Sequence, residues 1–119
     1  HTAVHPSAWV GRGVVLGEGT VVLAGAVLNA DAAVGAHCII NTGAIIEHDC
    51  GVGAYTHISP RATLCGTVSV GKEVHIGAGA VVRNNLRICS YTVVGAGGVV
   101  VRDIIEPGTY VGNPVRRLR

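Results

Sequence analysis

The sequence repeats with a period of six residues, and this repeat restricts the fold more than any other feature of the chain. Every sixth residue from Val4 to Val100 is Val, Ile or Leu, without an insertion. These positions are Val4, Val10, Leu16, Val22, Leu28, Val34, Ile40, Ile46, Val52, Ile58, Leu64, Val70, Ile76, Val82, Ile88, Val94 and Val100. An α-helix cannot keep one apolar stripe on its surface with a period of six. The repeat therefore predicts short strands and excludes a helix.

A second column of mostly small residues accompanies the aliphatic one. Its members, such as Ala26, Cys38, Ala44 and Cys50, stand two residues before the next aliphatic position. Residues two apart on a strand point to the same side, so both columns are expected in one core. The chain has 18 Gly and no Phe, so small and β-branched side chains must fill that core. Glycine often follows the aliphatic residue, where it suits a turn between strands.

The composition limits the classes of protein to which the chain can belong. Its 119 residues fit one domain, and the absence of Met indicates a trimmed terminus or a detached domain. The formal charge of +2 is too small to indicate nucleic acid binding. No apolar run approaches the roughly 18 residues that cross a membrane. Four cysteines without CxxC spacing indicate free thiols in a reducing cytoplasm.

The six-residue pattern resembles the hexapeptide repeat of the left-handed parallel β-helix family. In that family three hexads form one coil of a triangular prism, and the coils stack at the spacing of strands. The resemblance implies an all-β fold of about six 18-residue coils. It also implies a left-handed winding, an exception to the rule for crossovers. Glu106 occupies the next aliphatic position after Val100. We therefore expect a β-helix domain over residues 1–105 and a C-terminal tail over 106–119.

A histidine between two acids stands out from this pattern in the segment NTGAIIEHDCGVGAYTHISP, residues 41–60. Glu47 and Asp49 flank His48, the third residue of its hexad, which is expected to point outward from a turn. A carboxylate beside an imidazole orients the ring and stabilises its protonated form. A general base needs this arrangement. The alternative is an ordinary solvated histidine.

A second histidine, His57, follows His48 by nine residues, which is half of an 18-residue coil. Half a coil places the two side chains on opposite sides of one prism. A joint role therefore predicts a site between two subunits. His75 lies 18 residues after His57 and is expected in the same column, one coil along. The alternative for both is a pair of solvent or interface histidines.

The segment NTGAIIEHDCGVGAYTHISP, together with VVVRDIIEPGTYVGNP near the C-terminus, resembles a narrower family. This family comprises the sugar O-/N-acyltransferases of the sialic-acid and bacillosamine type. The resemblance implies a homotrimer that uses acetyl-CoA, with sites between subunits. Members of the family join an N-terminal sugar-nucleotide-binding domain to a C-terminal β-helix, and only the β-helix is expected here.

The resemblance also implies a role for individual residues. His48 matches the catalytic base, Asp49 the acid that raises its basicity, and Asn41 the polar residue beside the base. Glu47 completes the predicted catalytic group as the second flanking acid.

The same resemblance implies coenzyme contacts. His57 matches the histidine that contacts acetyl-CoA from the adjacent subunit. Gly66 and Ala78 match positions that offer backbone groups to the coenzyme. The coenzyme phosphates attract cations, for which Lys72, Arg83 and Arg87 are candidates by location. The alternative for these three is a solvated side chain.

The function implied is acetyl-CoA-dependent N-acetylation of a nucleotide-linked amino sugar, by direct transfer with His48 as general base. O-acetylation of a sugar or of serine stays open, as does a trimerising scaffold without activity. A γ-type carbonic anhydrase is disfavoured, because it needs two histidines five apart and the spacings here are 9 and 18. We expect no metal.

Overall fold

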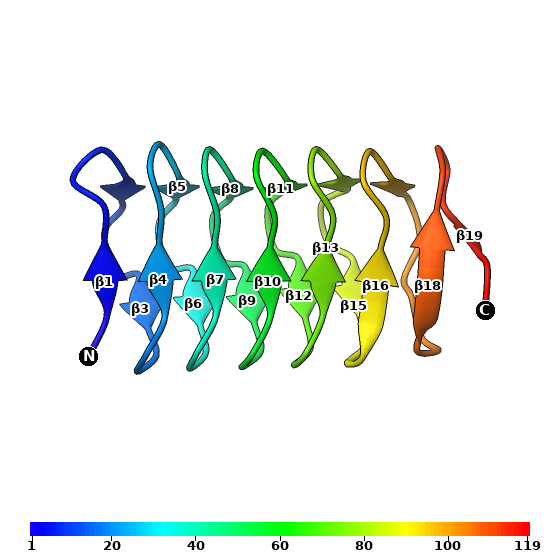
Figure 1. Cartoon of the computed structure of the whole chain (residues 1–119), viewed down its shortest axis with the longest axis horizontal. Helices are drawn as coiled ribbons and strands as arrows, with labels where there is room; N and C mark the ends of the chain where they lie inside the picture. Colours follow the sequence, from blue (N-terminus) through cyan, green and yellow to red (C-terminus); the bar gives the residue numbers. More distant parts are fainter.

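The computed structural model describes residues 1–119, and every regular element in it is a strand (Figure 1). The strands form three sheets. Sheet A contains β1 (Ala3–Val4), β4 (Val21–Val22), β7 (Ile39–Ile40), β10 (His57–Ile58), β13 (His75–Ile76), β16 (Thr92–Val94), β18 (Gly108–Val111) and β19 (Arg116–Arg117). Sheet B contains β2 (Trp9–Val10), β5 (Val27–Leu28), β8 (Ile45–Ile46), β11 (Thr63–Leu64), β14 (Val81–Val82) and β17 (Val99–Val100). Sheet C contains β3 (Val15–Leu16), β6 (Ala33–Val34), β9 (Gly51–Val52), β12 (Ser69–Val70) and β15 (Arg87–Ile88).

The chain passes from sheet A to B to C and then returns to A one coil further on. Residues 18 apart pair in parallel, as Ile46 does with Leu64. In Figure 1 the parallel strands of sheet A, from β1 to β18, run upward at the front, and the chain returns behind them while it advances to the right. This winding is left-handed. The predicted all-β fold, a left-handed parallel β-helix of about six coils, is confirmed.

The core is the column of aliphatic residues that defines the repeat. In each two-residue strand the second side chain points inward, and Ile40, Ile46 and Ile58 are fully buried. Val4 and Val10 are exposed because they lie in the first coil, which is covered on one side only. The small column fills the corners, where Cys38 and Cys50 are buried among the core residues. Burial raises the pKa of both thiols, as expected for cysteines that serve in packing.

The prism has three corners, which we name A–B, B–C and C–A after the sheets they join. Backbone angles in the left-handed region occur inside these corners, for example at Asp49 (φ 60°) and Tyr55 (φ 61°). Gly53 precedes Tyr55 by two residues and does not have a positive φ. It is small for another reason: an added Cβ would lie 2.5 Å from the backbone of Gly71 and Lys72 in the next coil. Gly53, which follows an aliphatic residue of the repeat, was expected to be glycine for the turn. It is instead needed because the neighbouring coil lies so close.

Beyond Val100 the chain continues to pair with the prism. Ile104 forms a bridge with Ile88, and β18 adds to sheet A in parallel beside β16. β19 then turns back antiparallel to β18. The tail predicted from Glu106 onward therefore closes the end of the prism as two further strands of sheet A.

Candidate active site

His48 lies in the B–C corner, in the turn that follows β8. Its side chain is 59% exposed, and its Nδ1 atom lies 3.1 Å from Oδ2 of Asp49. An ionised carboxylate can only accept a hydrogen bond, so Nδ1 carries the hydrogen and Nε2 is left with a free lone pair. The left-handed backbone at Asp49 belongs to the same turn. When the imidazole is neutral, the pair therefore presents Nε2 as the atom that can accept a proton.

Two other predicted site residues, Glu47 and Gly66, lie near this pair. Glu47 donates its backbone N–H to the Leu64 oxygen, and its carboxylate makes no ion pair with His48. Of the two flanking acids, only Asp49 contacts the imidazole. Gly66 stands 18 residues after His48, in the same corner one coil along. An added Cβ at Gly66 would lie 2.6 Å from Nε2 of His48. We call Glu47, His48, Asp49 and Gly66 the base cluster.

Asn41 lies in a second group of polar side chains, on sheet A and the A–B corner. Its Oδ1 atom accepts the backbone N–H of Thr42 at 2.7 Å, which turns the amide NH2 group toward His57. The distance from Asn41 Nδ2 to His57 Nε2 is 3.0 Å. The NH2 group can only donate, so His57 accepts at Nε2 and carries its hydrogen on Nδ1.

The second group continues one coil along with His75. The rings of His57 and His75 meet edge to face with centroids 4.9 Å apart. Ser59 Oγ lies 3.1 Å from Nε2 of His75. We call Asn41, His57, Ser59 and His75 the histidine-pair cluster. Ser59 was not predicted as a site residue, although it occupies the same hexad position as Asn41, one coil later.

The two clusters do not meet within one chain. In a triangular prism the B–C corner lies opposite sheet A, which carries His57 in β10. Asn41 was predicted beside the base, but within the chain it contacts His57 and not His48. Ala78, in the A–B corner after β13, lies on the side of the histidine-pair cluster. One chain therefore presents two separate halves of the predicted site.

The pKa of His57 is lowered below the usual 6.5, first by burial and second by the nearby His75. We expect an NMR titration to show His57 charging below pH 6.5, and His75→Gln to raise its midpoint part of the way, because burial remains. Since the folded state resists this protonation, the contribution to stability is complete above pH 6.5 and is lost as the pH falls further. An unchanged midpoint in His75→Gln would contradict the contact between the two rings.

No family model matches the sequence, and no curated protein matches it. Solved structures do match. The acetyltransferase domain of PglB from Neisseria gonorrhoeae is 40% identical with a TM-score of 0.97, over 99% of this chain and 58% of that one. PerB from Caulobacter crescentus, solved with CoA and GDP-perosamine, is 47% identical with a TM-score of 0.96, over 98% of this chain and 56% of that one.

Over nearly its whole length, the chain is similar to these two acetyltransferase structures. It spans little more than half the length of the PglB and PerB chains. AntD from Bacillus cereus matches with a TM-score of 0.94 at 18% identity, over 99% of this chain and 79% of that one, which shows the shared fold alone. The predicted resemblance to the hexapeptide-repeat sugar acyltransferases is thus confirmed.

The candidate cations lie at different places on the prism. Lys72 is at the C–A corner, with Nζ 5.6 Å from the centroid of the Tyr91 ring. Arg87 points outward from sheet C, and Arg83 follows β14 into the B–C corner. Arg102, which was not predicted as a candidate, stands 54 residues after His48 and so occupies the same corner position three coils along. The paired strands β14 and β17 keep this register.

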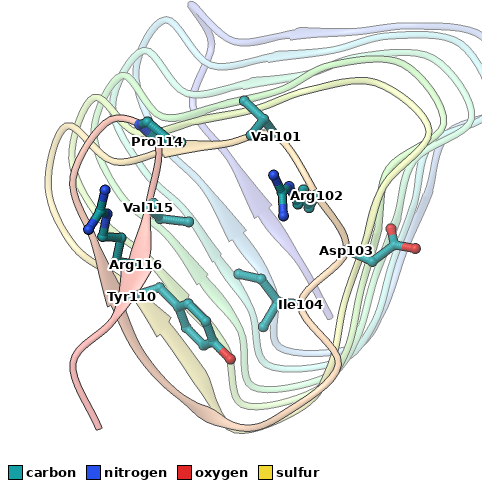
Figure 2. Close-up of a pocket in the computed structure, with 8 residues that line it drawn as sticks. All are labelled: Val101, Arg102, Asp103, Ile104, Tyr110, Pro114, Val115 and Arg116. Atoms are coloured by element: carbon teal, nitrogen blue, oxygen red, sulfur yellow. The ribbon is translucent and has the colours of Figure 1, made fainter.

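The hollows of the domain are open. One of about 420 Å³ runs along the B–C corner from Asp49 past Thr67 and Asn85, and it reaches sheet C at Arg87. Another of about 360 Å³ lies at the C-terminal end of the prism, where Arg102 and Arg116 stand over apolar side chains (Figure 2). Its lining residues are Val101, Arg102, Asp103, Ile104, Tyr110, Pro114, Val115 and Arg116. This second hollow is about 14 Å from the level of His48 at the spacing of strands.

The remaining observations concern metal ligands, cysteines and membrane-spanning segments. The structure gathers no group of three or more His, Cys, Asp or Glu side chains around a point where a metal ion would fit. All four cysteines are free. No element is a helix of the length and apolarity that crossing a membrane requires.

Proposed function

We propose that this domain carries out acetyl-CoA-dependent N-acetylation of a nucleotide-linked amino sugar. The observation that carries the proposal is the His48–Asp49 pair, which leaves Nε2 of an exposed imidazole free to accept a proton. PerB, which is 47% identical, was solved with CoA and an amino-sugar nucleotide, and the PglB acetyltransferase domain with acetyl coenzyme A. An acidic partner and an accessible ring nitrogen are the features that general base catalysis requires.

The reaction proceeds by direct transfer. The amine nitrogen of the acceptor attacks the thioester carbonyl while Nε2 of His48 takes a proton from it. The tetrahedral intermediate carries its negative charge on the carbonyl oxygen, which backbone N–H groups or the Nδ1–H of His57 stabilise. The carbon–sulfur bond then breaks, the CoA sulfur leaves with the electron pair, and His48 returns the proton to it. The products are the N-acetyl sugar and CoA, and no acetylated residue forms.

The proposal includes a homotrimer with three shared sites. The base cluster and the histidine-pair cluster lie on opposite sides of one prism, so a neighbouring chain must supply the second cluster. The outward side chains of sheet A around that cluster include the apolar residues Val21, Ile39 and Val93, and Ile39 and Val93 remain exposed. Their burial against a second prism is favourable. The free thiols fit a cytoplasmic location, where acetyl-CoA is available.

Mass spectrometry of the products tests this function. The protein is incubated with acetyl-CoA and, separately, a nucleotide-linked amino sugar, its hydroxyl analogue and serine. A gain of one acetyl group on the amino sugar alone supports the proposal. Acetylation of the hydroxyl analogue or of serine would move the function to O-acetylation. No product from any acceptor, with a trimer still present by light scattering, would favour the scaffold.

Arg102 is expected to bind the phosphates of the coenzyme. The arm of CoA from the thioester sulfur to the first phosphate has about thirteen bonds and extends about 15 Å, close to the roughly 14 Å that separate three coils. We expect Arg102→Met to raise KM for acetyl-CoA about tenfold, because a hydrogen bond between charged groups is lost, and to leave kcat unchanged. Arg12→Met is the matched control, since Arg12 occupies the same corner position two coils before His48. A raised KM in the control alone would reverse the proposed direction of the coenzyme.

A further inference from the structure

The imidazole of His48 packs against the backbone of Gly66 in the next coil. A Cβ built on Gly66 would lie 2.6 Å from Nε2, 2.8 Å from Cε1 and 3.3 Å from Cδ2 of the ring. No other side chain stands as near to that position. We propose that Gly66 is a positioning residue, which is glycine so that the His48 ring can lie in its productive place. The proposal rests on the function proposed above, in which Nε2 of His48 takes the proton.

The backbone conformation does not require a glycine at position 66. Gly66 does not have a positive φ, so an alanine would meet no conformational strain there. Gly53 offers a contrast, because its Cβ would meet backbone atoms of the next coil at 2.5 Å. At Gly66 the atoms in the way belong only to the end of a side chain. A methyl group at Gly66 therefore displaces the ring of His48 and leaves the stacking of the coils unchanged.

Two contacts together determine the position of the ring. Asp49 holds Nδ1 at 3.1 Å, and Gly66 lies against the outer end of the ring, where Nε2 and Cε1 are nearest. The turn that carries His48 is bonded to both neighbouring coils: Asp49 N–H donates to the Ala30 oxygen at 3.0 Å, and Thr67 N–H donates to the His48 oxygen at 2.9 Å. The small residues Ala30 and Gly66 thus flank His48 along the corner. The ring has a defined place although much of it is exposed.

The expected consequence of Gly66→Ala is a loss of rate without a loss of stability. The new methyl group forces Nε2 away from its position or covers it, and a displacement of about 1 Å can lower a rate by about 10²-fold. We therefore expect kcat to fall about 10²-fold. KM for acetyl-CoA should change by less than about twofold, since the backbone N–H and C=O of residue 66 remain. The melting temperature should stay the same, because a flexible side chain can move aside.

A double-mutant cycle separates this role from the coenzyme contact that the family resemblance implies for Gly66. In a His48→Gln background, Gly66→Ala should have no further effect on the residual kcat, because the ring that it displaces is gone. An equal loss of rate in both backgrounds would overturn the proposal. A raised KM for acetyl-CoA with an unchanged kcat would also overturn it and would support a simple coenzyme contact.

A measurement without substrate keeps the proposal separate from the proposed function. The ring signals of His48 are assigned in ¹H–¹⁵N spectra by their absence in His48→Gln, and are then compared between the unsubstituted protein and Gly66→Ala. A shift of the His48 Nε2 and Cε1–H signals, with the other histidines unchanged, supports the contact even if no acetyl transfer is detected. Unchanged His48 signals would overturn it even if the protein proves to be an active acetyltransferase.

Discussion

Replacing His48 with glutamine is expected to lower kcat for acetyl transfer by about 10²- to 10⁴-fold, the range that a general base contributes. Glutamine retains a polar side chain of similar length but cannot take a proton from the acceptor amine at neutral pH. KM for acetyl-CoA should change little, because proton transfer belongs to the transition state and not to coenzyme binding. Initial rates measured by mass spectrometry over a range of coenzyme concentrations separate the two constants.

The matched control is His5→Gln. His5 is an exposed histidine of the first coil whose Nδ1 atom accepts the backbone N–H of Ser7, and it lies outside both clusters. Its replacement should leave kcat unchanged. A His48→Gln protein that keeps more than about half of the rate would rule out His48 as the base, since that loss is far below the range for general base catalysis.

Replacing Gly53 with alanine is expected to lower the free energy of unfolding by about 3 kcal/mol, the upper part of the usual range for overpacking. The new Cβ would lie 2.5 Å from the carbonyl carbon of Gly71 and from the nitrogen of Lys72. Neither atom can move aside, because Gly53 N–H donates to the Val70 oxygen at 2.8 Å and holds the two coils together. Equilibrium denaturation at one subunit concentration measures the loss, since subunit association changes apparent stability.

Gly51→Ala provides the control for this change. Gly51 is the outward residue of β9, two positions earlier, and nothing lies within 4 Å of its added Cβ. We expect the free energy of unfolding of the Gly51→Ala variant to rise slightly, by up to about 1 kcal/mol, because alanine loses less backbone freedom on folding than glycine. If Gly51→Ala and Gly53→Ala lost the same stability, the close approach of the coils would not be the reason for glycine at position 53.

The fold could be predicted almost completely from the sequence because its rule is local. Each hexad holds one short strand and one corner, and the aliphatic residue must point inward in every strand. The outward position of His48 follows from its place in the hexad, as does the separation of His48 from His57 by half a coil. The structure has both features. The C-terminal strands were not predicted, because residues 108–117 do not follow the repeat.

The order of the residues alone specifies the register of the hexads, and with it the core, the corners and the position of each polar residue in its coil. Which of these residues contact one another became clear from the folded chain. Asn41 contacts His57, and the His48 ring packs over Gly66, through pairs that are 16 and 18 residues apart. Such contacts depend on side-chain orientation and on the few ångströms of space between stacked coils. A pattern of residue types specifies the stacking of coils but not how that space is used.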